Sequence, residues 1–386
     1  MCDKLKIKRT AKSSALKNNL IFGSNLTLSM IKTVKFSKIK LEMRKPFKIA
    51  LGSTDFYEGF FVSLESDDGE IGFGEATTTP FITGDTIGSI ENELEVFSKN
   101  LIGMEESPEL VNDRMKGAMK SSKASRNAID CALWDVIGKK AGQNLTKLLG
   151  NHKRSIQTSY TVDLVDSRSA RKQAEELKSQ GIKVFKIKMG SGIDDDVDRV
   201  KTVREVIGTR PMLYVDFNQA YTPKMAVIIS RKLEDYNVEF LEQPVKANDI
   251  SGLKFVRDNS TIPVFADEAI FTPKNVADIL SKEAADGINI KLMKSGGLTD
   301  SIKMIDTAES FGVPVMIGCM VETRLANTAG LVAALSRAGV RYADLDGYSN
   351  IIEDPVEGGI TLHNGEVSLN DHVSGIGSSP QKNYIQ

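Results

Sequence analysis

Residues 184–189 read Val-Phe-Lys-Ile-Lys-Met, a short apolar run that carries two lysines. Apolar runs of this length are typical of buried β-strands. Similar runs recur along the second half of the chain, and they end on Lys188, Asp216, Glu242, Asp267 and Lys291. The gaps between these residues are 28, 26, 25 and 24 positions, and Gly318 and Asp344 continue the series. A period in this range indicates stacked strand–helix units.

The alternation predicts eight parallel strands. We expect them at 156–162, 184–189, 212–217, 238–242, 263–267, 287–291, 313–318 and 342–345. Amphipathic segments between them, such as 167–180, 194–207, 223–236 and 299–311, are expected to be helices. Eight strands can close a (β/α)8 TIM barrel, whose chemistry lies at the C-terminal ends of the strands.

The chain before the barrel has a different pattern. Residues 34–43 alternate like a strand, and Asp67-Asp68-Gly69 is a hairpin signal. Helical patterns follow at 87–100, 108–120 and 125–140. Strands first and helices afterwards predict an α+β unit at residues 30–154, with the barrel at 155–345. We expect the tail, residues 346–386, to return to the α+β unit.

Composition excludes several classes of protein. A net charge of −1 gives no electrostatic basis for binding nucleic acid or an anionic membrane. No apolar stretch approaches the roughly 20 residues of a membrane helix. Cys2, Cys131 and Cys319 are scattered, which favours a reducing compartment and a cytoplasmic location over a disulfide framework or zinc site. Residues 1–29 are basic and are expected to be disordered. A secretory signal is the alternative, but polar residues interrupt its apolar core.

Three acids should converge at one rim of the barrel, because Asp216, Glu242 and Asp267 end consecutive strands. Clustered carboxylates repel one another unless a cation neutralises them. A hard divalent cation such as Mg²⁺ takes oxygen ligands and keeps positions open for a substrate oxygen. The alternative role, capping of the following helices, becomes less plausible when three acids recur in succession.

The lysines suggest proton transfer. Side chains alternate along a strand, so Lys186 and Lys188 share one face, where neighbouring ammonium groups are expected to lower each other's pKa. Lys291 ends a strand on the opposite wall. A substrate between them would meet an amine on each face. In an alternative arrangement Lys186 only neutralises the acids and Lys188 points outward. His152, His363 and His372 lie outside the strand ends, which disfavours a Lys–His pair.

The chain from residue 30 onward resembles the enolase superfamily, in particular its muconate-lactonizing subgroup. The matching segments are Phe185-Lys186-Ile187-Lys188, Asp216-Phe217-Asn218-Gln219, Leu241-Glu242-Gln243-Pro244, Ala266-Asp267-Glu268 and Asn289-Ile290-Lys291. The resemblance implies an α+β capping domain over a modified barrel, completed by the C-terminal tail. It also implies one Mg²⁺ per subunit on Asp216, Glu242 and Asp267. Lys188 and Lys291 would be the acid/base pair at the carbon α to a carboxylate.

Further segments resemble dipeptide epimerases, including L-Ala-D/L-Glu epimerases. By this resemblance, Asp344 and Asp346 of Asp344-Leu345-Asp346 would hold the α-ammonium of a dipeptide. Paired carboxylates suit an ammonium group chemically. Thr161 and Lys186 would contact the carboxylate end. Ile82 of Ile82-Thr83-Gly84-Asp85 and Met320 of Gly318-Cys319-Met320-Val321-Glu322 would lie beside the substrate. We expect this small molecule to be the only partner besides further copies of the chain in a homo-oligomer.

One position departs from the family pattern. Members that act on Ala-Glu have an arginine in the first capping-domain loop, where it pairs with the substrate glutamate. In this chain the loop at 50–55 has Gly52 near that position. Without the cation an acidic side chain has no charge-assisted partner. The sequence therefore predicts a dipeptide whose second residue is hydrophobic or cationic, so that the enzyme is not strictly specific for Ala-Glu.

Other functions remain open at this level. N-acylamino acid racemisation, o-succinylbenzoate synthesis and muconate cycloisomerisation use the same scaffold on substrates without a free ammonium. A Schiff-base aldolase would use a strand lysine as nucleophile. A catalytically silent ligand-binding protein is the alternative from a different class.

Overall fold

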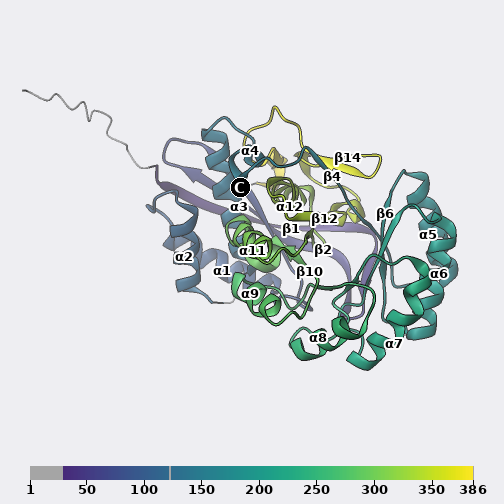
Figure 1. Cartoon of the computed structure of the whole chain (residues 1–386). Helices are drawn as coiled ribbons and strands as arrows, with labels where there is room; N and C mark the ends of the chain where they lie inside the picture. The colour runs from purple at the N-terminus through teal and green to yellow at the C-terminus, as the bar shows by residue number, and fades with distance from the viewer. Residues whose placement is uncertain (1–28, 121–122, 386) are drawn as a thin grey trace, which may run out of the picture.

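The computed structural model describes residues 29–120 and 123–385. Except for Ser29, the extension expected at 1–29 lies outside the described residues. The described chain forms an antiparallel N-terminal sheet with its helices, then a parallel sheet surrounded by helices (Figure 1). Within residues 29–120 and 123–385, no helix is long and apolar enough to cross a membrane.

The N-terminal unit is a three-stranded meander covered by helices. Its strands are β1 (Ile31–Ile49), β2 (Gly52–Ser66) and β3 (Ile71–Thr77). The helices that follow are α1 (Ile87–Asn100), α2 (Pro108–Ala118), α3 (Lys123–Lys140) and α4 (Leu145–Leu149). Helix α3 packs directly on β3. A Cβ atom at Gly72 or Gly74 would lie 2.0 or 1.9 Å from a backbone oxygen of α3, so these glycines permit the close approach.

The parallel sheet has eight strands whose spatial order follows the chain, which confirms the predicted barrel architecture. They are β5 (Tyr160–Val162), β6 (Val184–Lys188), β7 (Met212–Asp216), β8 (Leu241–Glu242), β9 (Val264–Ala266), β10 (Gly287–Lys291), β11 (Val315–Gly318) and β12 (Val340–Asp344). Right-handed strand–helix repeats of this kind place all the C-terminal strand ends at one rim.

Helices separate the successive strands. They are α5 (Ser167–Ser179), α6 (Ile193–Ile207), α7 (Pro223–Leu233), α8 (Ile250–Asn259), α9 (Pro273–Ser281), α10 (Leu292–Ser295), α11 (Leu298–Ser310) and α12 (Arg324–Ser336). Thr222 and Thr272 cap α7 and α9 immediately before a proline, which is a favoured way to begin a helix. The helix expected at 223–236 ends at Leu233 and continues as a 3₁₀ turn.

The strand expected at 156–162 is interrupted. Residues Ser155–Gln157 form β4, which pairs antiparallel with β15 of the tail, whereas β5 pairs with β6 in the barrel. Between them, Thr158 forms a parallel bridge to Ala343 beside β12. This bridge brings together β5 and β12, the two outer strands of the sheet. The chain forms it where its pairing changes from β15 of the tail to β6 of the barrel.

The tail contains β13 (Val356–Gly358), β14 (Thr361–His363), β15 (Glu366–Ser368) and β16 (Ser378–Pro380). It contacts both a strand and a helix of the N-terminal unit. Ile351 forms a bridge to Met43 of β1, and the backbone N–H of Ile376 donates to Asp135 Oδ1 of α3 at 2.7 Å. It contacts the barrel through the pairing of β15 with β4.

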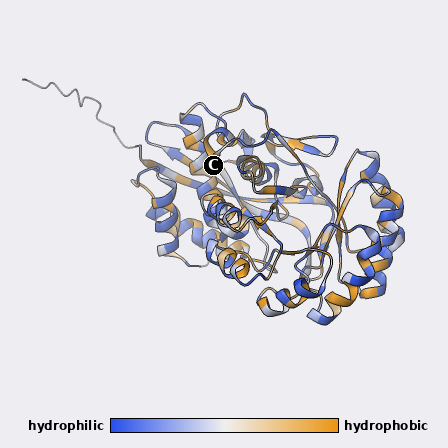
Figure 2. Cartoon of the chain, viewed as in Figure 1, coloured by the Kyte–Doolittle hydropathy of each residue, from blue (hydrophilic) through white to orange (hydrophobic). Residues whose placement is uncertain are grey.

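The two ends of the barrel interior differ in polarity. Apolar side chains fill the layer between strands and helices, and the surrounding helices carry both hydrophobic and hydrophilic residues (Figure 2). At the N-terminal end of the strands, Val184, Tyr214, Phe240, Phe265 and Met316 form a separate buried cluster. The C-terminal end is occupied instead by lysines and acids, so polar side chains gather where the strands meet the N-terminal unit.

Candidate active site

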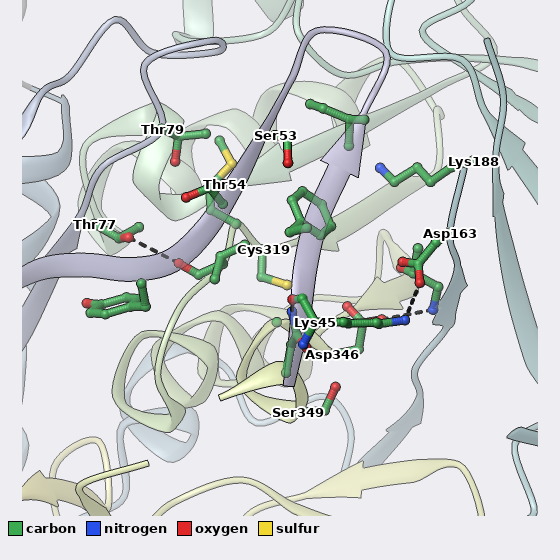
Figure 3. Close-up of a pocket in the computed structure, with 18 of the residues that line it drawn as sticks. Lys45, Ser53, Thr54, Thr77, Thr79, Asp163, Lys188, Cys319, Asp346 and Ser349 are labelled. Carbon is green, nitrogen blue, oxygen red and sulfur yellow. Dashed lines mark hydrogen bonds and ion pairs between the residues drawn. The ribbon is translucent and has the colours of Figure 1, made fainter. Parts of the chain in front are cut away.

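A cavity of about 590 Å³ lies between the N-terminal sheet and the C-terminal ends of the barrel strands (Figure 3). Nine of the twelve predicted site residues line it: Lys186, Lys188, Lys291, Thr161, Asp344, Asp346, Met320, Ile82 and Gly52. The remaining three, Asp216, Glu242 and Asp267, are fully buried and pair with the lysines. The fold therefore brings all twelve to one region.

Lys188 and Lys291 reach the cavity from different walls. Lys188 ends β6 and Lys291 ends β10, four strands away in the sheet. The Lys188 Nζ lies 2.7 Å from Asp216 Oδ2 and 3.0 Å from Asn218 Oδ1. The Lys291 Nζ lies 2.8 Å from Asp267 Oδ2. Burial lowers the pKa of Lys291, but the charges of Asp267, Glu242 and Glu268 together outweigh burial and raise it.

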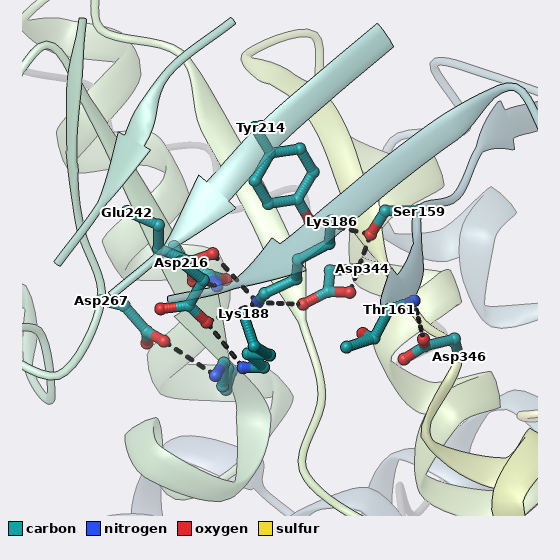
Figure 4. A network of polar contacts seen from close by, with 12 residues as sticks. Ser159, Thr161, Lys186, Lys188, Tyr214, Asp216, Glu242, Asp267, Asp344 and Asp346 are labelled. Atoms are coloured by element: carbon teal, nitrogen blue, oxygen red, sulfur yellow. Dashed lines mark hydrogen bonds and ion pairs between the residues drawn. The ribbon is translucent and has the colours of Figure 1, made fainter. Parts of the chain in front are cut away.

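Lys186 is the centre of the acidic cluster (Figure 4). Its Nζ lies 2.7 Å from Asp344 Oδ2, 2.9 Å from Glu242 Oε2 and 3.0 Å from Asp216 Oδ2. Lys186 and Lys188 both contact Asp216 Oδ2 and both line the cavity, so the shared face predicted from alternation is confirmed and the outward Lys188 is not found. The expected lowering of pKa is wrong for Lys186. Burial does lower its pKa, but the surrounding carboxylates outweigh burial and hold it well above the ordinary value.

The acids differ in their electrostatic surroundings. Burial, reinforced by the Asp216 charge, raises the pKa of Glu242 to about 8. Burial also acts to raise the pKa of Asp216, but the charges of Lys186 and Lys188 outweigh it and lower that pKa. The lysines therefore neutralise the three acids unevenly, and among Asp216, Glu242 and Asp267 the negative charge of Glu242 is the least compensated.

Sequence reasoning missed Lys294 and the amide side chains around the acids. Lys294 Nζ forms a buried ion pair with Asp267 Oδ1, and burial lowers the pKa of this lysine. Asn289 Nδ2 donates to Glu242 Oε1 at 2.7 Å. A signal for Lys294 was present, because it follows Lys291 by three positions in a segment that begins a helical turn.

The donor set fits a hard divalent cation. Asp216, Glu242 and Asp267 supply only carboxylate oxygens, from the ends of neighbouring strands. Glu242 Oε2 and Asp267 Oδ2 are buried, and each forms an ion pair with a single lysine, Lys186 and Lys291 respectively. In the described part of the chain, no three acidic side chains are oriented to ligate one ion together, since each of these pairs with a lysine. Carboxylate side chains rotate easily about their terminal bonds, so these three acids can turn from the lysines towards a shared cation.

Asp344 and Asp346 have different environments. Asp344, at the end of β12, is buried and accepts from both Lys186 and Ser159. Asp346 accepts from the backbone N–H of Thr161 at 2.9 Å and lines the cavity. Burial, together with the Asp344 charge, raises the pKa of Asp346 to about 6. Both carboxylates would be partly relieved of repulsion by a cationic group in the cavity.

The N-terminal unit supplies an apolar wall. The loop expected at 50–55 is shorter than predicted, because the hairpin pairing continues to Ile49–Gly52 and Gly52 already belongs to β2. The Phe81 ring packs against Gly52: a Cβ atom there would lie 2.6 Å from the ring. Phe47, Ile49 and Ile82 also line the cavity. The space of a side chain at position 52 is thus taken by an aromatic ring.

Contacts at the rim hold the N-terminal unit to the barrel and to the tail, and sequence reasoning did not identify them. Lys45 Nζ pairs with Asp163, which follows β5 (Figure 3). The Arg44 Nε donates to the backbone oxygen of Ser349 at 3.2 Å. These side chains come from the irregular part of β1 between Glu42 and Phe47. They place the hairpin tip over the cavity.

Fold and site together define a class of protein: a capped parallel barrel with buried amines on opposite walls of an acid-lined cavity. Residues 31–150 match the model of the mandelate racemase/muconate lactonizing enzyme N-terminal domain, and residues 169–384 match the enolase C-terminal domain-like model. The chain belongs to this mandelate racemase/muconate lactonizing enzyme family of the enolase superfamily.

Curated relatives and solved structures agree with the family. The hydrophobic dipeptide epimerase of Enterococcus faecalis is 34% identical over 90% of this chain and 99% of that protein. The L-Ala-D/L-Glu epimerase of Clostridium acetobutylicum is 34% identical over 89% of this chain and 97% of that protein. The crystal structure of the Enterococcus faecalis dipeptide epimerase with Mg and L-Leu-L-Tyr superimposes with a TM-score of 0.88 at 34% identity, covering 91% of this chain and 99% of that one.

Proposed function

We propose that the protein is a dipeptide epimerase, an isomerase that inverts the α-carbon next to the free carboxylate of a dipeptide. The observation that carries the proposal is the pair Lys188 and Lys291, which reach one cavity from strands four places apart. Relatives about 34% identical over most of the chain are named dipeptide epimerases. Their names support the substrate class, and the lysine pair supports the reaction.

The lysines would act from opposite faces of the substrate. One amine, in its free-base form, takes the α-proton, and the other, as an ammonium group, returns a proton to the opposite face. Asp216 and Asp267 next to these amines hold them in position. A Mg²⁺ ion on Asp216, Glu242 and Asp267 would neutralise charge that develops on the substrate carboxylate. Thr161 and Lys186 are proposed to contact that carboxylate.

The ammonium end distinguishes this function from its nearest alternatives. Asp344 and Asp346 offer two carboxylates beside the cavity, where a free α-ammonium would be bound. Substrates of N-acylamino acid racemases, o-succinylbenzoate synthases and muconate cycloisomerases have no such group. Asp344→Asn should therefore impair turnover of dipeptides more than turnover of N-acylamino acids.

The preferred dipeptide is proposed not to carry glutamate as its second residue. Gly52 provides no cation, and the Phe81 ring beside it, with Phe47 and Ile82, favours an apolar side chain. Of the two classes the sequence left open, the apolar one agrees better with this wall. Epimerisation of L-Ala-L-Glu as fast as the best dipeptide would contradict this preference.

The deciding experiment is a dipeptide panel incubated with the protein and Mg²⁺ in D2O and analysed by mass spectrometry. Each turnover leaves one deuterium at the inverted carbon, so dipeptides with apolar second residues should gain mass fastest. N-acylamino acids in the same panel test the alternative reaction. Borohydride trapping of the protein with a carbonyl substrate, insensitive to EDTA, would favour an aldolase. No exchange across the panel would favour a silent binding protein.

We propose one Mg²⁺ per polypeptide, a homo-oligomeric assembly and a cytoplasmic location. Cys131 and Cys319 are free, which agrees with a reducing compartment. Metal analysis of the purified protein and light scattering would measure the stoichiometry and the assembly directly.

A further inference from the structure

Two hydroxyl groups connect the buried aromatic cluster at the N-terminal end of the barrel strands to Asp344 (Figure 4). The Tyr214 hydroxyl of β7 lies 2.7 Å from Ser159 Oγ, and Ser159 Oγ lies 2.8 Å from Asp344 Oδ1. Tyr214 and Ser159 are buried, with exposed fractions of 1% and 0%. Neither residue lines the cavity. Their hydroxyl groups therefore reach the site through Asp344, while the Tyr214 ring separately lies 5.8 Å from Lys186 Nζ.

The direction of these hydrogen bonds follows from the groups involved. An ionised carboxylate can only accept, so Ser159 must donate its single hydroxyl proton to Asp344. Ser159 Oγ is then left as the acceptor, and Tyr214 must donate to it. The other oxygen of Asp344, Oδ2, accepts from Lys186 at 2.7 Å. Both oxygens are thus engaged and the plane of the carboxylate is set.

The backbone around Ser159 reinforces this arrangement. The Ser159 N–H donates to the carbonyl oxygen of Ala343 at 2.9 Å, and Thr158 Oγ1 accepts from the Leu345 N–H at 2.9 Å. These bonds fix the residues before and after Asp344. The interruption between β4 and β5 is what brings Thr158 and Ser159 to β12.

The Tyr214 hydroxyl is itself held in place by aromatic packing. Its ring stacks on Phe240 with a centroid distance of 4.3 Å, and Phe240 stacks on Phe265 at 3.9 Å. Tyr342 meets both phenylalanine rings edge-on. Rings packed in this way have little freedom to move, so the hydroxyl is a preorganised donor.

We propose that Ser159 and Tyr214 are positioning residues that hold the Asp344 carboxylate in the orientation needed to bind a substrate ammonium group. This inference rests on the proposed function, because Asp344 is the ammonium site of a dipeptide epimerase. An Asp344 carboxylate held by two donors still has lone pairs directed into the cavity. A freely rotating carboxylate would instead turn more of its lone pairs towards Lys186.

The test compares Tyr214→Phe and Ser159→Ala with a matched control, Tyr342→Phe. The control removes a hydroxyl from the same aromatic cluster, but that hydroxyl donates to Glu239 and not towards Asp344. The ligands are the best dipeptide of the panel and its N-acetyl derivative. Turnover is measured by α-proton exchange in D2O, and the affinity for a derivative that is not turned over is measured by competitive inhibition. Thermal unfolding is measured for every variant.

We expect Tyr214→Phe to raise KM for the dipeptide roughly 3- to 10-fold and Ser159→Ala to raise it more, since hydrogen bonds to charged groups are the stronger ones. The kcat should change little, because the lysines are untouched. Affinity for the N-acetyl derivative should stay the same in both variants, and Tyr342→Phe should behave like the wild type.

Two results would overturn the inference. One is an unchanged KM in Tyr214→Phe, a variant that keeps the ring stack and is expected to fold. The other is an equal loss of affinity for the free and the acetylated ligand, which would show a general structural defect. A wild-type protein that exchanges no α-proton in any dipeptide would instead overturn the proposed function, and this inference with it.

Discussion

At the scale of single residues, the site is a set of buried charges that are stable only as a set. Lys186, Lys188, Lys291 and Lys294 are each at most 4% exposed. An isolated buried ammonium group would lose its charge or destabilise the fold, but here every one of these lysines lies against an acid. Removing one lysine or one acid of this set therefore changes the protonation of the charged side chains that remain beside it.

Lys188→Ala and Lys291→Ala should each reduce epimerisation by at least about 10²-fold, the usual minimum for loss of a general acid or base. Each variant should still exchange the α-proton of the one stereoisomer whose proton faces the remaining lysine. Proton NMR in D2O with both stereoisomers measures this. The control is Lys183→Ala, because Lys183 is exposed and directly precedes β6, the strand that ends at Lys188. Equal loss of exchange for both stereoisomers would contradict the two-face arrangement.

Asp130 gives a pH-dependent prediction away from the site. It lies on α3 and accepts from the N–H and hydroxyl of Thr299 on α11, and burial raises its pKa to about 7. The native state thus binds this proton more tightly than the unfolded state, whose pKa is near 4. The contribution of Asp130 to stability should fall as pH rises from about 4 to 7.

Asp130→Asn imitates the protonated form and should remove this pH dependence. The wild type should lose up to roughly 4 kcal/mol of unfolding free energy relative to the variant across that window. Urea unfolding at pH 4, 5, 6, 7 and 8 measures the difference. A difference that stays constant with pH would show that Asp130 titrates normally.

At the scale of elements, the β1–β2 hairpin and the 77–82 loop form one surface over the cavity. Gly52 has no positive φ, so its backbone tolerates a side chain, but the Phe81 ring occupies the space. Phe81 is 47% exposed and can move. The specificity of the site therefore depends on the packing of two elements and not on position 52 alone.

Gly52→Arg combined with Phe81→Ala should shift preference towards dipeptides ending in glutamate. The introduced guanidinium group supplies the missing cation, and the smaller residue at 81 removes the clash. The ratio of kcat/KM for L-Ala-L-Glu to that for the best apolar dipeptide is the measurement, with an expected rise of about tenfold or more. Phe81→Ala alone is the control and should only weaken the apolar preference. An unchanged ratio in the double variant would place the side-chain pocket elsewhere.

At the scale of the whole molecule, the tail joins the two units. We propose the division into a capping domain at 30–154, a barrel at 155–345 and a tail at 346–386 that completes the capping domain. The tail contacts Asp135 and Met43 in the first unit and β4 at the start of the barrel. Ile376 is fully buried within these contacts.

Deleting residues 371–386 should lower the unfolding temperature by several degrees or more, because Asp135 loses its Ile376 N–H donor and a buried side chain is removed. Deleting only 382–386 is the control and should have a smaller effect. Calorimetry measures both. Equal unfolding temperatures for the long deletion and the full chain would show that the tail does not stabilise the fold.

Metal removal tests the assembled site as a unit. EDTA should abolish α-proton exchange, and added Mg²⁺ should restore it, because the acidic cluster is proposed to need a divalent cation. Mg²⁺ should also raise the unfolding temperature, since a ligand at 100 times its Kd adds about 2.7 kcal/mol to stability. Asp216→Asn should weaken both responses. Full exchange in EDTA would exclude a metal-dependent reaction.

The sequence by itself determined the architecture and the shared rim. A period of about 26 residues and alternation within strands are local properties of the chain, so they place Lys186, Lys188, the three acids and Lys291 before any packing is known. Those residues do meet in the structure. The same reasoning predicted one continuous strand at 156–162, and this is wrong. The chain changes its pairing partner between β4 and β5, and such a change leaves no periodic signal in the sequence.

Tertiary structure alone decided which groups are neighbours across strands and units. Lys186 pairs with three acids from three strands, and this contact raises its pKa where sequence spacing had suggested the opposite. Ser159 and Tyr214 are 55 positions apart, and Gly52 meets Phe81 of another segment. The physical reason is that Coulomb interactions and packing depend on distance in space, which a one-dimensional pattern specifies only within an element.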